Sequence, residues 1–149
     1  IALMLTVLLL GSIPGPIVAG RLSDRFGRKP VIVGVYLGGA VAVALVLLAG
    51  ADPVLLWGAV LFLGAFSFVE SPQLQALLAD VARPALRDAS FSVYFTLAFG
   101  VGALWTAAYG AITDAAGDAA GLPIVLGVMA VASVAAACAS LPIRATPRA

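Results

Sequence analysis

The acidic residue Glu70 lies in a polar stretch, FSFVESPQLQ, inside a segment that is otherwise apolar. Ser67, Glu70 and Gln73 recur every three residues, so a helix would place them on one face. A carboxylate in a membrane helix costs roughly 2.5–3.5 kcal/mol on insertion scales, so it usually faces a cavity or a partner. Pro72 removes a backbone donor and frees a carbonyl for water or solute. These features make Glu70 a candidate proton or solute site.

The alternative for Glu70 is a structural role, in which it pairs with a Lys or Arg on a helix outside this chain. No basic residue of the chain lies deep enough in an apolar segment to be that partner. The polar neighbours and the expected helix break favour the functional interpretation.

A second group of reactive side chains is the stretch GRLSDRFGRK at 20–29, which holds four of the eight basic residues. Gly20 and Gly27 flank Asp24, and glycines allow a tight reversal and close helix approach. Asp24 can accept N–H groups at a helix N-terminus, which stabilises by about 0.3–1 kcal/mol. The alternative is an ordinary short basic loop. That alternative accounts for the four cations but not for the two glycines and Asp24. We predict a loop that latches helices together.

The composition predicts an all-α integral membrane protein. The chain is 63% hydrophobic and 10% charged, with a mean hydropathy of +1.16, whereas soluble domains carry about 25% charged residues. Apolar runs of about 20 residues fit membrane-spanning helices. A lone cysteine, Cys138, excludes a disulfide or metal framework. Five spans are expected, at about 1–19, 30–50, 53–79, 89–113 and 121–142.

The basic residues predict the orientation, because cytoplasmic loops carry the excess of Lys and Arg. All eight follow the first, third or fifth span: Arg21, Arg25, Arg28, Lys29, Arg83, Arg87, Arg144 and Arg148. The connections at 50–53 and 114–121 carry only the acids Asp52, Asp114 and Asp118. We expect the Ile1 end outside and the C-terminus in the cytoplasm, in the bacterial inner (plasma) membrane. No basic flank precedes the first apolar run, which argues against a signal peptide and favours part of a longer protein.

The 20–29 stretch resembles the loop motif G-x-L-x-D-R-x-G-R-[KR] of the major facilitator superfamily. The matching residues are Gly20, Leu22, Asp24, Arg25, Gly27, Arg28 and Lys29. The resemblance implies one part of a twelve-helix secondary transporter built from two six-helix halves. It also implies that Asp24 engages a helix N-terminus of the other half and that Arg28 pairs with Asp80. The plain alternative is that Asp80 only caps or solvates its helix end.

Five helices after an external start fit either helices 8–12 or helices 2–6 of such a transporter. Residues 91–117 look like helix 11 and its outer turn. Trp105 and Thr106 stand where a Gly-Pro pair of helix 5 is found in many of the family's antiporters. The third span also lacks the intramembrane Arg of many proton-coupled members. We favour helices 8–12, so five of the six helices of one half.

The resemblance implies transport of a small organic solute by alternating access, coupled to protons, with efflux antiport favoured over symport. Glu70, Ser67 and Gln73 are the expected proton and substrate pathway. Trp105 and Tyr109, four residues apart, are further candidates because aromatic side chains bind organic solutes. Helix packing or an outer aromatic anchor is the alternative for this pair.

The sequence carries no histidine and no group of metal ligands, so we expect no enzyme and no cofactor. The expected partners are a small-molecule substrate, protons, the lipid bilayer and the missing transporter half of the same polypeptide. Nothing indicates a nucleic-acid partner. The alternative is a non-transporting structural or assembly subunit, or a truncated remnant of a transporter.

Overall fold

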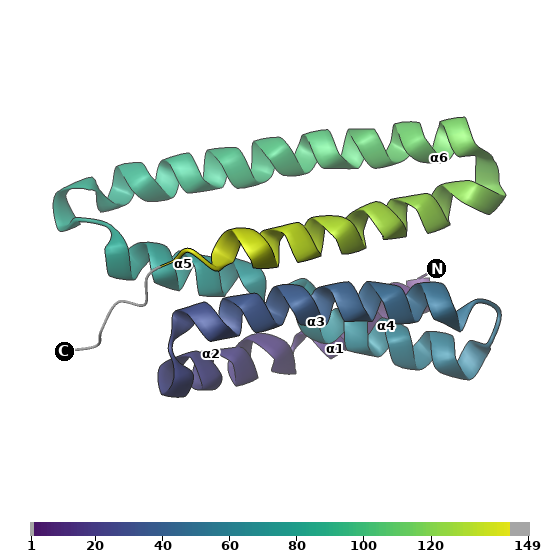
Figure 1. The fold of residues 1–149 in the computed structure, drawn as a ribbon, viewed down its shortest axis with the longest axis horizontal. Helices are drawn as coiled ribbons and strands as arrows, with labels where there is room; N and C mark the ends of the chain where they lie inside the picture. Colours follow the sequence, from purple (N-terminus) through teal and green to yellow (C-terminus); the bar gives the residue numbers. More distant parts are fainter. Residues whose placement is uncertain (1, 144–149) are drawn as a thin grey trace. The chain divides into compact units, whose positions relative to one another are not determined.

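The computed structural model describes residues 2–143, and all regular structure in this range is helical (Figure 1). The elements are α1 (Ala2–Ser12), α2 (Pro14–Phe26), α3 (Arg28–Ala49), α4 (Pro53–Ser67), α5 (Glu70–Val81), the 3₁₀ turn η1 (Pro84–Leu86) and α6 (Arg87–Ser140). Five segments are long and apolar enough to cross a membrane: Ala2–Phe26, Arg28–Ala49, Pro53–Val81, Pro84–Gly117 and Ala119–Ser140. The prediction of an all-α protein with five such helices is confirmed.

Two of the expected connections are wrong in their extent. The stretch 20–29 was expected to be a loop, but α2 continues to Phe26 and α3 begins at Arg28, so only Gly27 is non-helical. The stretch 114–121 was also expected to be a connection, but α6 (Arg87–Ser140) runs through it and departs from helical geometry only at Gly117. Charged residues mark where an apolar run ends, but a helix can continue past that point because its backbone bonds do not depend on side-chain polarity. The expectations for Ile1, Arg144 and Arg148 fall outside the described residues.

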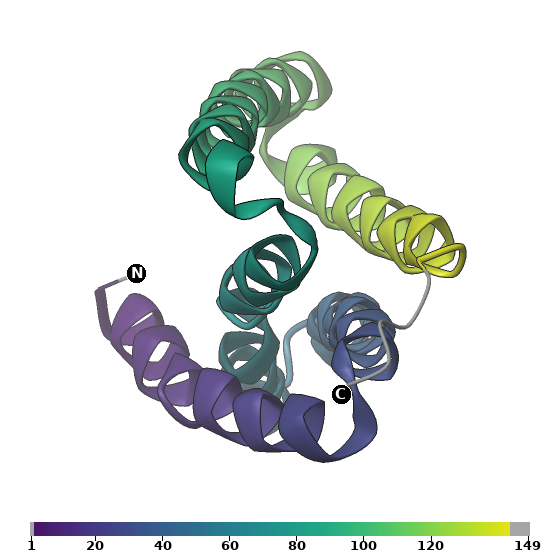
Figure 2. The same ribbon diagram turned by 90° about the vertical axis from the view of Figure 1, so that its left-hand side faces the viewer.

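The chain divides into two compact units, Ile1–Leu74 with Leu126–Ala149, and Gln75–Val125. In the first unit α4 packs against both α1 and α3, and α2 packs against α3. Figure 2 shows α1 and α2 (purple to blue) as an oblique run of turns beside α3 and α4. α4 is therefore the central helix of the packing among these four.

Glycines bring α1 and α4 into backbone contact. Gly64 of α4 lies against the backbone of Leu8, and Gly11 of α1 lies against the carbonyl of Leu61. A Cβ on Gly11 would lie 2.6 Å from that carbonyl oxygen. Small residues at a contact allow membrane helices to approach this closely, which increases their van der Waals contact.

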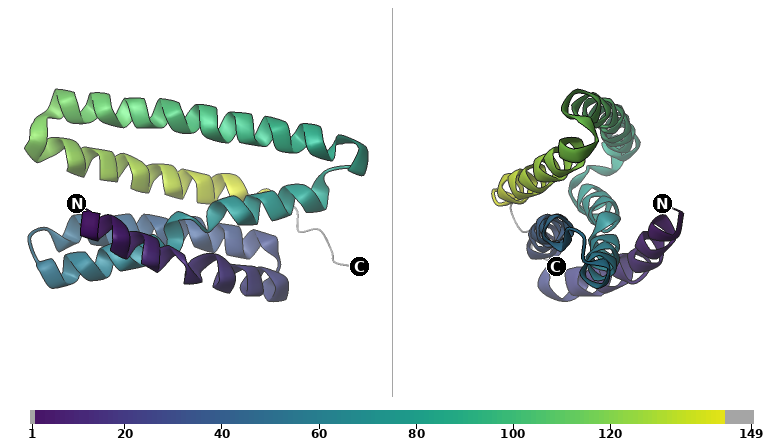
Figure 3. Two further views of the ribbon diagram at one scale, coloured as in Figure 1. Left: turned by 180° about the vertical axis from the view of Figure 1, so that it is seen from behind. Right: turned by 90° about the vertical axis from the view of Figure 1, so that its right-hand side faces the viewer.

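The first and third spans are both broken near their middle (Figure 3). α1 ends at Ser12 and α2 begins at Pro14. Proline is favoured at the first position of a helix, because the N–H group that it lacks would have no partner within the helix there. α4 ends at Ser67 and α5 begins at Glu70, so Phe68 and Val69 separate the two helices. The structure therefore has the break expected beside Pro72.

An aromatic side chain of α4 packs against α3. The ring of Phe66 lies against Gly38 of α3, where a Cβ would overlap it, and its centroid is 5.0 Å from that of Phe62. At the start of α4, Asp52 caps the helix by accepting the backbone N–H groups of Val54 and Leu55 at 2.9 and 3.1 Å. These contacts fix the position of α4, which ends beside Glu70.

The second unit holds the end of α5, η1 and α6 as far as Val125. Arg87 Nη2 donates to the carbonyl of Ala79 at 3.2 Å, which satisfies one of the last carbonyls of α5. At Gly117, with φ of 74°, the chain turns back (Figure 1). Just after this turn Gly121 packs on Thr113, where a Cβ would lie 2.8 Å from the Thr113 Cα atom.

Candidate functional site

The chain reverses between α2 and α3 at Gly27. A reversal was expected from Gly20 and Gly27, and Gly27 is the glycine that makes it. Gly27 has φ of 93° and ψ of 163°, a combination open essentially to glycine alone. Its N–H donates to the carbonyl of Ser23 at 3.0 Å and so closes the last turn of α2. Gly20 instead lies within α2, where a Cβ would meet nothing within 4 Å, so it takes no part in the reversal.

Arg28 ties the two helices together through a residue that the sequence reasoning missed. Arg28 Nη1 donates to the hydroxyl of Ser23 at 3.2 Å, and Ser23 is fully buried. The bond joins the first residue of α3 to the last turn of α2, so it fixes the angle of the reversal. The sequence feature that could have indicated this role is the position of Ser23, a small polar residue one helical turn before Gly27 and between the motif positions Leu22 and Asp24.

The other cations of the motif surround this reversal. The Arg25 guanidinium carbon lies 5.3 Å from the ring centroid of Phe26, a cation–π contact that is worth about 0.5–1 kcal/mol at an exposed site. Lys29 lies in the first turn of α3. All seven motif residues thus lie within one unit of the structure. Asp80 lies in the last turn of α5, in the other unit, so its pairing with Arg28 stays a prediction.

The structure separates the three residues that were expected on one helix face. Ser67 is the last residue of α4, and its hydroxyl donates to the carbonyl of Leu63 at 2.8 Å. Glu70 and Gln73 lie beyond the break, in the first turn of α5. The expectation of one continuous face is therefore wrong for Ser67, because the chain leaves helical geometry at Phe68, with φ of −120° and ψ of 12°.

Glu70 and Gln73 differ in their surroundings. The Glu70 side chain is exposed, whereas Gln73 is 3% exposed. The Gln73 Oε1 atom is buried and accepts no hydrogen bond from the part of the chain that the structure describes. A buried acceptor without a donor costs about 1–3 kcal/mol. Gln73 is therefore suited to accept a hydrogen bond from a group outside residues 2–143.

The candidate aromatic pair lies on α6. The Trp105 and Tyr109 rings stack with centroids 5.5 Å apart and planes 26° apart, and Trp105 is 44% exposed. A row of three further rings precedes them on the same helix, with neighbouring centroids 6.1–6.3 Å apart: Phe91, Phe95 and Phe99. The stacking is compatible with either a substrate contact or a packing role, so both interpretations stay open.

The described side chains include residue types that can ligate metals. Among them, no three His, Cys, Asp or Glu residues are grouped so that they could hold a metal ion. Cys138, the chain's one cysteine, is a free thiol and is exposed. The chemistry that the described residues offer is hydrogen bonding, ion pairing and proton exchange at carboxyl groups.

Comparison with known proteins gives two matches. A profile of the Major Facilitator Superfamily matches residues 1–149. The uncharacterized MFS-type transporter YfnC of Bacillus subtilis (strain 168) is 36% identical to the chain over 110 residues. That alignment covers 74% of the chain but only 26% of the relative. The matched segment thus spans about a quarter of the relative's length. No solved structure matches the chain significantly.

Proposed function

Because the chain belongs to the Major Facilitator Superfamily, we propose that it forms five helices of a transporter that moves a small organic solute across the membrane by alternating access. The family's members are transporters rather than enzymes. The chain aligns with about a quarter of its relative, so the transport site requires the rest of the polypeptide. Helices 8–12 remain the assignment that we favour for this part.

The observation that carries the proposal is the break between α4 and α5. The break is followed directly by the first turn of α5, which holds the exposed Glu70 and the buried Gln73 inside a membrane-spanning segment. Broken helices with polar termini are a common way to build a solute site near the membrane midplane. The unsatisfied Gln73 Oε1 supplies an acceptor for a donor group of the solute.

We extend the proposal to proton coupling, with Glu70 as the group that exchanges the proton. A carboxyl group in a membrane-spanning segment is a functional candidate by default, because the cost of a charge within the membrane must be offset by a partner or by water. Support for efflux by antiport comes only from the family resemblance of the motif. The substrate class stays at the level of a small organic solute.

The turn between α2 and α3 is proposed to be the cytoplasmic gate. The Arg28–Ser23 hydrogen bond and the glycine geometry of Gly27 keep this turn in one conformation. A rigid turn can present Asp24 to a helix of the other transporter half and Arg28 to Asp80. The predicted cytoplasmic position of this turn follows from the distribution of basic residues.

The proposal is tested with the full-length protein in proteoliposomes, using a solute found by screening for pH-gradient-driven accumulation. Glu70→Gln should abolish accumulation but preserve counterflow exchange, because the solute site remains while the proton carrier is lost. Asp114→Asn, which removes an exposed carboxylate of α6, is the matched control and should accumulate like wild type. Normal accumulation by Glu70→Gln would exclude the coupling role. Absence of flux for every solute would favour the structural-subunit alternative.

A further inference from the structure

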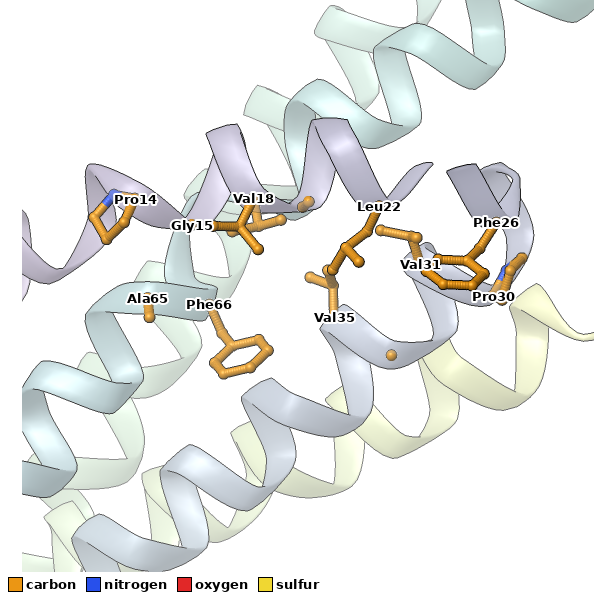
Figure 4. Close-up of a pocket in the computed structure, with 13 residues that line it drawn as sticks. Pro14, Gly15, Val18, Leu22, Phe26, Pro30, Val31, Val35, Ala65 and Phe66 are labelled. Atoms are coloured by element: carbon orange, nitrogen blue, oxygen red, sulfur yellow. The ribbon is translucent and has the colours of Figure 1, made fainter. Parts of the chain in front are cut away.

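An apolar groove of about 500 Å³ lies between α2 and α3 and ends at the last turn of α4 (Figure 4). Its thirteen lining residues are all apolar or glycine, and all belong to the first unit. Leu22 of α2 and Val35 of α3 point into it from opposite sides, and Phe66 lies beyond them at the α4 end. The groove is therefore a continuous hydrocarbon surface on a membrane-spanning part of the chain.

Basic residues adjoin the other end of the groove in the sequence. Its last lining residues are Phe26 and Pro30, on either side of the Gly27 reversal. The Arg25 guanidinium lies over the Phe26 ring, with Cζ 5.3 Å from the ring centroid. Lys29 directly precedes Pro30. The apolar groove therefore ends at a lining residue, Phe26, that carries the Arg25 guanidinium, and at Pro30, which follows Lys29 in the sequence.

We propose that this groove binds an anionic phospholipid, with one acyl chain between α2 and α3 and the phosphate held by Arg25 and Lys29. The apolar lining matches an acyl chain, and cations at a helix end match a headgroup phosphate. Stretch 20–29 has a net charge of +3, since Asp24 offsets one of its four cations. Arg28 is left out of the phosphate site because it already donates to Ser23.

Charge complementarity favours a lipid over the other occupant to be considered, a helix from elsewhere in the polypeptide. A helix would cover the apolar wall but would bring no phosphate to the cations at its end. A lipid satisfies both ends with one molecule. Occupancy would also join α2 to α3, because the acyl chain contacts Leu22 and Val35 together.

The experiment is native mass spectrometry of the purified full-length protein, titrated with phosphatidylglycerol and with phosphatidylcholine of the same acyl chains. We expect tighter binding of phosphatidylglycerol. Arg25→Gln with Lys29→Gln should weaken it about 25-fold, since each cation near a membrane surface accounts for about fivefold. Arg83→Gln, which removes a cation outside the groove, is the control and should bind as wild type.

A second pair of variants tests the acyl-chain part. Gly34 lines the groove and Gly39 does not, and a Cβ on either would meet nothing within 4 Å. Gly34→Phe should therefore reduce phosphatidylglycerol binding by filling the groove, whereas Gly39→Phe should not. Equal affinity for the two lipids, or unchanged binding in both the charge variant and Gly34→Phe, would overturn the proposal. If a helix fills the groove, Gly34→Phe would lower the melting temperature without affecting lipid binding, which also overturns it.

Discussion

Substitution of Gly64 by alanine tests the close contact between α1 and α4. A Cβ at this position would overlap the carbonyl oxygen of Leu8 and lie 3.0 and 3.2 Å from its C and Cα atoms. All three atoms belong to the backbone of α1, so no flexible side chain can move aside. Relief of the overlap requires the two helices to separate, and overpacking of this kind costs about 1–3 kcal/mol.

The matched control is Gly58→Ala, on the same helix. A Cβ on Gly58 would meet nothing within 4 Å. Alanine is favoured over glycine in a helix by about 0.8–1 kcal/mol, and this gain applies to both substitutions. The difference between the two variants therefore isolates the clash. Gly64→Ala should have a free energy of unfolding about 1–3 kcal/mol lower than that of Gly58→Ala.

The assay is reversible unfolding of the full-length protein by SDS in mixed micelles, with the helical signal in circular dichroism as the readout. Equal free energies of unfolding for the two variants would refute the reasoning. That result would mean that α1 does not contact α4 through its backbone in the complete protein.

Three further predictions concern the α2–α3 turn, the cap of α4 and the proposed gate. Gly27→Ala should lower the free energy of unfolding by about 1–3 kcal/mol in the same assay, because φ of 93° with ψ of 163° strains any other residue. Asp52→Ala should lower the free energy of unfolding by about 0.5–2 kcal/mol through loss of the α4 cap. Asp52→Asn should retain most of the stabilisation that the cap provides. Asp80→Arg should impair transport in proteoliposomes, and combination with Arg28→Asp should partly restore it.

Each of these predictions has a contrary result. Wild-type stability of Gly27→Ala would mean that the reversal adopts another backbone conformation. An Asp52→Asn variant as unstable as Asp52→Ala would point to the charge rather than the cap. A double swap no better than either single change would exclude the Arg28–Asp80 pair.

The spans could be predicted from the sequence because apolar runs of membrane length leave few alternatives. Their ends were less certain. Arg21 and Asp24 suggested a loop, yet they lie on the last turns of α2, since a charged side chain does not break a helix. Only Gly27, which has a positive φ, does so at this point.

The site was partly predictable. Pro72 correctly indicated a break near Glu70, but the position of the break, between Ser67 and Glu70, removes Ser67 from the predicted face. The burial of Gln73 depends on tertiary packing, which helical spacing alone does not contain. The Ser23–Arg28 bond was missed because it crosses the reversal, whose geometry depends on Gly27.

The central claim is that the full-length protein couples solute movement to proton movement through Glu70. The most direct measurement is the internal pH of proteoliposomes, followed with a trapped pH-sensitive dye after a gradient of a transported solute is imposed. Wild type should change the internal pH in step with solute flux, and Glu70→Gln should move solute without a pH change. A pH change of wild-type size in Glu70→Gln, or none in wild type during solute flux, would contradict the claim.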